Sequence, residues 1–162
     1  MRRLSLALSI TLAVLAAAAS PSGGADRAVR LQDANPLMNV SRNMAIIRTQ
    51  IGLGISYEQS ALDAVQAASG ADGLQDIPGV IHDGYAQLRF AVSGLRLKIQ
   101  VARVPQPTYE LAVENIDAAM AHIRTAKTAM ENALAGDARA LEAVIPNLQK
   151  AVQLVTLAAD LI

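Results

Sequence analysis

The sequence contains no cysteine and no tryptophan, and its only aromatic residues are three tyrosines and one phenylalanine. Without cysteine the chain cannot form disulfide bonds, thiolate metal sites, iron–sulfur clusters or a lipid-modified cysteine. Charge is also scarce and balanced, with 14 Lys+Arg against 14 Asp+Glu in 162 residues and no basic run. Nucleic-acid binding depends on phosphate neutralisation and base stacking, so we expect no nucleic-acid partner.

Residues 1–20 have the pattern of a secretory signal. Arg2 and Arg3 precede an uncharged apolar stretch, residues 4–19, which ends in a run of alanines. A cationic start, an apolar middle and a small-residue end define a signal peptide, and this stretch is shorter than the roughly 20 residues that span a bilayer. We therefore expect a periplasmic or secreted protein that is cleaved near Ala19, with residues 21–35 as a flexible polar leader. The alternative is an uncleaved signal, and membrane contact is expected only in that case.

Three reversal signals divide residues 36–162. They are the glycine-rich stretch 70–73, the two prolines in 105–107 and the glycine–aspartate pair 136–137. In each intervening segment, apolar residues recur at alternating three- and four-residue steps, which indicates amphipathic helices. The predicted helices cover about 37–69, 77–104, 108–135 and 138–161, and Asp76 is a suitable N-cap for the second. Short connections make consecutive helices antiparallel, so the predicted fold class is all-α, an up-down-up-down four-helix bundle.

Some residues violate the helical pattern. Gly52 and Gly54 lie inside the first predicted helix, where each costs roughly 1 kcal/mol relative to alanine, and Pro146 interrupts the fourth. These positions indicate either close helix packing or an irregularity beside a binding cleft. Glu58 and Lys127 interrupt apolar stripes, and we expect both charged groups to lie at the rim of the core, because a buried unpaired charge is costly.

Residues capable of chemistry are few. His82 and His122 fall on different predicted helices at well-separated levels, so they are not expected to share a metal. No glycine–serine nucleophile motif and no phosphate loop is present. The prediction is a protein that is not an enzyme and that has no cofactor and no metal.

A cationic ridge is predicted on the second helix, where basic residues recur at every seventh position. It is open to two interpretations, a docking ridge for an acidic partner or a solvated face beside acidic residues of the third helix. The ridge consists of His82, Arg89, Arg96 and Arg103, and the acidic residues are Glu110 and Asp117.

Three of the helices are apolar on a second side, opposite the stripe that forms the core. A helix that is apolar on two sides needs cover on two sides, so we predict an interaction surface at one end of the bundle. The cover is predicted to be a second copy of the chain, another exported or envelope protein, or residues 25–35 folded back. The predicted function is protein–protein association, and the alternative is a bundle that binds a small ligand, namely haem, a metal or a lipid-like molecule. The predicted surface consists of Ile46, Leu53, Tyr57, Phe90, Leu97, Val101, Val104, Leu154, Leu157 and Leu161, with Phe90, Leu97, Val101 and Leu157 as anchors.

Overall fold

The computed structural model describes residues 43–68, 71–102 and 104–162. The predicted signal, the predicted leader and the predicted helix start near residue 37 lie outside these residues. Within the described part the chain is all-helical and contains no strand. No helix in these ranges is long and apolar enough to span a bilayer.

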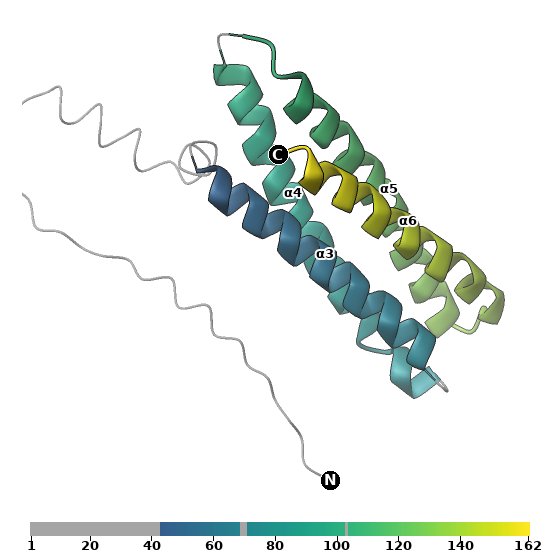
Figure 1. The fold of residues 1–162 in the computed structure, drawn as a ribbon. Helices are drawn as coiled ribbons and strands as arrows, with labels where there is room; N and C mark the ends of the chain where they lie inside the picture. Colours follow the sequence, from purple (N-terminus) through teal and green to yellow (C-terminus); the bar gives the residue numbers. More distant parts are fainter. Residues whose placement is uncertain (1–42, 69–70, 103) are drawn as a thin grey trace, which may run out of the picture.

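Four long helices account for most of the described chain (Figure 1). A 3-10 turn precedes α4 and another precedes α6, whereas the sequence pattern predicted an uninterrupted helix from residue 138. The elements are α3 Met44–Ala67, η1 Ala71–Leu74, α4 Ile77–Val101, α5 Pro107–Leu134, η2 Ala138–Ala140 and α6 Leu141–Asp160.

The ends of the helices follow from local chemistry. Asn43 caps α3, because its Oδ1 accepts a hydrogen bond from the Ala45 main-chain nitrogen at 3.0 Å. Pro107 opens α5, where its missing N–H costs nothing. Gly136 has a φ of 110°, and Asp137 caps η2 by accepting from the Arg139 nitrogen at 3.2 Å. Asp76 occupies the N-cap position of α4, but its backbone is helical and its side chain makes no capping hydrogen bond, so it does not act as the predicted cap.

The helices pack around one core. Figure 1 shows α3 and α6 side by side, with α4 and α5 behind them. Each helix packs chiefly against two others, in the pairs α3–α4, α4–α5, α5–α6 and α6–α3, and this closed order is typical of a four-helix bundle. The core is almost wholly aliphatic, and its largest side chains that are less than 2% exposed include Ile47, Ile51, Ile81, Leu88, Leu95, Ile116, Ile123, Met130 and Leu148.

Candidate functional site

The contact between α3 and α4 is built from two glycines and the side chains that fill the space above them. Leu88 of α4 lies over Gly54 of α3, with its Cδ2 only 2.5 Å from the place that a Cβ on Gly54 would take. One turn further along, the arrangement is reversed, because the Glu58 carboxyl of α3 lies over Gly84 of α4 and Oε1 occupies the space of the missing Cβ. The two glycines therefore let α3 and α4 pack closely, which explains the cost of Gly54 inside a helix.

Glu58 is completely buried, with an exposed fraction of 0%, and neither of its carboxyl oxygens has a hydrogen-bond partner. Burial raises the pKa of Glu58 from 4.5 to about 8 because an ionised carboxylate loses its hydration there. The prediction that this group lies at the rim is wrong. Glu58 projects from the middle of the buried side of α3, next to Ile51 and Leu62, so its side chain has no short path to water.

Lys127, the other charged residue in an apolar stripe, does lie at the rim. Its side chain is 32% exposed, and its ammonium pairs with the carboxylate of Glu131 one turn along α5. Glu58 and Lys127 both interrupt an apolar stripe in the sequence, but the Glu58 side chain is buried and the Lys127 side chain is partly exposed. The difference is that a glycine on the facing helix leaves space for Glu58.

The predicted interaction residues differ in exposure. Large exposed fractions are found for Leu53 (40%), Leu157 (49%), Val101 (62%) and Val104 (63%). The other six residues are half-buried, and they are Ile46, Tyr57, Phe90, Leu97, Leu154 and Leu161.

Six of these residues gather on the outward side of the α3–α4 pair. The contacts at Gly54 and Gly84 set the register, which brings Leu53 to within one residue of the level of Phe90 and Ile46 to within one residue of the level of Leu97. At about 100° per residue, Ile46, Leu53 and Tyr57 share one stripe of α3, and the Tyr57 Cβ lies against Gly84. We call these residues the α3–α4 face, and its members are Ile46, Leu53, Tyr57, Phe90, Leu97 and Val101.

The remaining leucines lie elsewhere. The Nδ1 atom of His122 is 2.8 Å from Oδ1 of Asn147, which fixes the register of α5 against α6. By that register Leu157 lies within one residue of the level of Leu111, a residue that sequence reasoning missed and that is 46% exposed. Together with Leu154 and Leu161, these leucines form a second group on the α5–α6 side, across the helical ring from the α3–α4 face.

The outward side of α3 is unusual in carrying no exposed charge from Thr49 to Ser60, since the only charged residue in that stretch is the buried Glu58. Gly52 lies on this side, and a Cβ added to it would meet nothing within 4 Å. Unlike Gly54, it has no packing reason within the described chain.

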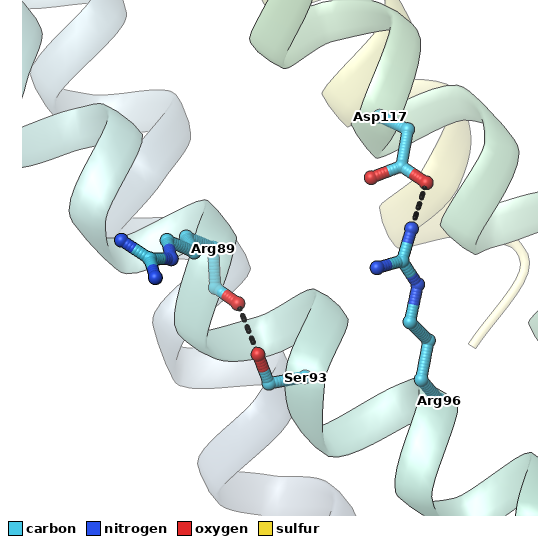
Figure 2. Close-up of polar contacts among 4 residues, drawn as sticks. All are labelled: Arg89, Ser93, Arg96 and Asp117. Carbon is cyan, nitrogen blue, oxygen red and sulfur yellow. Dashed lines mark hydrogen bonds and ion pairs between the residues drawn. The ribbon is translucent and has the colours of Figure 1, made fainter.

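The cationic ridge is partly neutralised. Figure 2 shows Arg96 reaching across to Asp117 of α5, with its Nη2 2.5 Å from Oδ2, whereas the guanidinium of Arg89 points away from this pair. The Ser93 hydroxyl donates to the Arg89 main-chain oxygen at 2.9 Å. Arg103 lies outside the described residues. The pairing of Arg96 favours the interpretation of the ridge as a solvated face next to an acidic neighbour.

An apolar hollow of about 390 Å³ lies at the end of the helices where α3 stops and α6 begins. Leu74 forms its most buried wall, at 7% exposure, and Leu134 is exposed at 37%. Among the described residues, no group of three or more histidines, aspartates and glutamates is placed to hold a metal. The hollow is lined by Val65, Ala68, Leu74, Ala133, Leu134, Ala138, Leu141 and Ile145, none of which has a polar side chain.

The sequence matches no protein-family model, no curated protein and no solved structure in the three comparisons made. Function must therefore be argued from the geometry of the chain itself.

Proposed function

We propose that the chain is an exported, non-enzymatic four-helix-bundle protein that works by protein–protein association through the α3–α4 face. The observation that carries this proposal is the outward side of α3, which exposes Leu53 but no charge over residues 49–60. Solvated helix faces ordinarily carry charged residues, and contiguous exposed apolar groups favour contact with another surface.

The partner we propose for this face is a second copy of the chain. The uncharged outward side of α3 has nothing to offer an acidic or basic partner, but it can lie against its own copy without repulsion between like charges. The exposed glycine supports the same conclusion. Gly52 costs α3 helix stability with no internal packing in return, whereas a partner helix that approached closely would make use of the missing side chain.

The test is the molar mass of the cleaved protein, measured by light scattering for the unmodified chain and for two variants. Leu53→Asp places a charge in the α3–α4 face and should weaken the dimer by roughly 30-fold or more, as expected for loss of about 2 kcal/mol at a central residue. Leu134→Asp is the matched control, because Leu134 is similarly exposed at 37% against 40% but lies at the end of α5. It should leave the dimer intact.

Three results would contradict self-association through this face. One is a dimer that survives Leu53→Asp. Another is a monomer whose Leu53 is shielded by residues 25–35, which would show that the leader covers the face. The third is a monomer with Leu53 bare, which would direct the search to a different envelope partner.

A second candidate function is binding of a lipid-like molecule in the apolar hollow. Its volume of about 390 Å³ falls within the roughly 300–1,000 Å³ range of small-molecule sites. An entirely apolar lining favours a hydrocarbon chain over haem or a metal, both of which need ligating side chains. Displacement of a fluorescent fatty acid by dodecanoate tests this, with Ala133→Phe filling the hollow and Ala118→Phe, on the exposed side of α5, as the control. Binding that persists in Ala133→Phe would contradict the assignment.

A further inference from the structure

Glu58 is the one buried acidic residue of the described chain, and nothing in the proposed association requires it. Its carboxyl is enclosed between α3 and α4, over the glycine that makes room for it. A buried polar group without a hydrogen bond lowers stability, and a buried charge without a partner does so far more. The burial of this carboxyl therefore matters most when the group is ionised.

No neighbouring charge relieves this cost. Burial is the only cause of the shift in the pKa of Glu58, and no hydrogen bond reaches either oxygen. On α3 itself, Arg48 bonds to the Ile162 main-chain oxygen and Asp63 accepts from Gln59. Among the helices packed around Glu58, α4 carries the titratable or charged groups His82, Asp83, Tyr85, Arg89, Arg96 and Lys98. Those of α5 are Tyr109, Glu110, Glu114, Asp117, His122, Arg124, Lys127 and Glu131. Those of α6 are Glu142, Lys150 and Asp160.

We propose that Glu58 is a proton-controlled latch between α3 and α4. With the carboxyl protonated, α3 and α4 close over Gly54 and Gly84. When the carboxyl ionises, the two helices part locally at this level and admit water to the carboxylate.

The α3–α4 contact is where relief is cheapest. On its other sides Glu58 is held in an aliphatic core, where parting the helices would expose large side chains such as Ile51 and Leu62. Along the contact with α4, the residue that faces the carboxyl is Gly84, which has no side chain to be exposed. A separation confined to the level of Gly84, one turn away from the Leu88 contact, exposes little apolar surface and hydrates the charge.

The direction of the pH response follows from linkage. A proton is held by the closed state up to about pH 8 and is released in an open, hydrated state near pH 4.5. The equilibrium constant for opening should therefore rise about tenfold per pH unit within this window and level off above pH 8. Between pH 5 and pH 7.5 the total rise should be about a hundredfold.

Hydrogen exchange of the full chain measures this opening directly. In the unmodified protein, the protection of amides around Gly54 and Gly84 should fall about a hundredfold between pH 5 and pH 7.5. This protection is corrected for the intrinsic pH dependence of exchange. Amides in the middle of α5 should change much less. Glu58→Gln, which cannot ionise, should make protection around the two glycines independent of pH. Glu114→Gln, which neutralises an exposed glutamate of α5, should behave like the unmodified chain.

A second measurement does not depend on the folding of a variant. Carbon-13 NMR of the Glu58 carboxyl in the unmodified protein should show a titration midpoint near pH 8. A midpoint near 4.5 would overturn the latch, and so would an equal pH response in Glu58→Gln. Neither measurement depends on the oligomeric state, so a monomeric protein would refute the proposed association without touching the latch.

Discussion

The α3–α4 pair and the α5–α6 pair solve the same packing problem in different ways. Both need small residues to bring two helices together. The α5–α6 half uses alanines, with Ala119, Ala126, Ala151 and Ala158 all at 0% exposure. The α3–α4 half uses Gly54 and Gly84 and encloses a carboxyl. Alanine favours the helix, whereas each glycine costs roughly 1 kcal/mol. The contact between α5 and α6 is therefore more stabilising than the contact between α3 and α4.

Polar groups show the same contrast. In the α5–α6 half, His122 bonds to Asn147, whose Nδ2 donates to the Ala143 main-chain oxygen at 2.7 Å. In the α3–α4 half, both oxygens of Glu58 lack a partner. Pro146 interrupts α6, but Gly52 and the unpartnered carboxyl of Glu58 both lie on α3, and α3 also has the uncharged outward side. This is the physical reason for assigning both the association and the latch to α3 and α4.

The largest effect expected from this contrast is on pH dependence. Because the pKa of Glu58 is raised, the folded chain holds a proton that the unfolded chain releases, and stability falls as pH rises from about 4.5 to 8. The loss should total about 4 to 5 kcal/mol, at 1.36 kcal/mol for each unit of pKa difference. Urea unfolding at a series of pH values measures it, with Glu58→Gln as the reference. If both proteins lost stability equally, the carboxyl would not be the cause.

Among the described residues, removing the carboxyl should leave neither helix pair with a buried polar side-chain group that lacks a partner. Glu58→Met keeps the length of the side chain but never has to hold a proton, so it should raise the free energy of unfolding by about 3 kcal/mol at pH 7. The gain should shrink as the pH falls to 4.5 and below, where the carboxyl becomes protonated in the unfolded chain as well. A variant less stable than the unmodified chain at pH 7 would show that Glu58 has a stabilising partner in solution.

The glycines of α3 should respond in opposite directions. Gly54→Ala forces a Cβ against Leu88 and should lower stability by about 1 to 2 kcal/mol, the cost of overpacking less the gain in helix propensity. Gly52→Ala meets open space and should raise stability by about 1 kcal/mol. Thermal unfolding at low protein concentration gives both values. Equal effects would mean that α3 and α4 are not in close contact at Gly54.

The smallest effect is expected in the α5–α6 half. His122→Ala removes the hydrogen bond to Asn147 and should cost about 1 kcal/mol, with no loss of association. Denaturant unfolding and light scattering on the same sample check the two parts of this prediction. A loss of the dimer in His122→Ala would indicate that the interface lies on α5 and α6 and not on the α3–α4 face.

Much of this architecture could be predicted from the sequence, but the burial of the Glu58 carboxyl between α3 and α4 could not. Apolar periodicity and the reversals near Gly73, 105–107 and Gly136 predict the helices, because these signals are local. The burial of Glu58 depends on which residue of α4 faces it, and that register is a tertiary property. One signal was present: Gly54 and Glu58 on α3 have the same four-residue spacing as Gly84 and Leu88 on α4. Asp76 fails as a cap because its own backbone is helical, whereas a capping residue has an extended backbone.

The distance between spin labels on two copies of the chain tests most directly which half meets its partner. Because the chain has no cysteine, single substitutions can be labelled cleanly, at Gln59 on the exposed side of α3 and at Thr125 on that of α5. The account predicts that the label at position 59 gives the shorter distance between copies. A shorter distance from position 125, or no coupling between copies at either position, would contradict it.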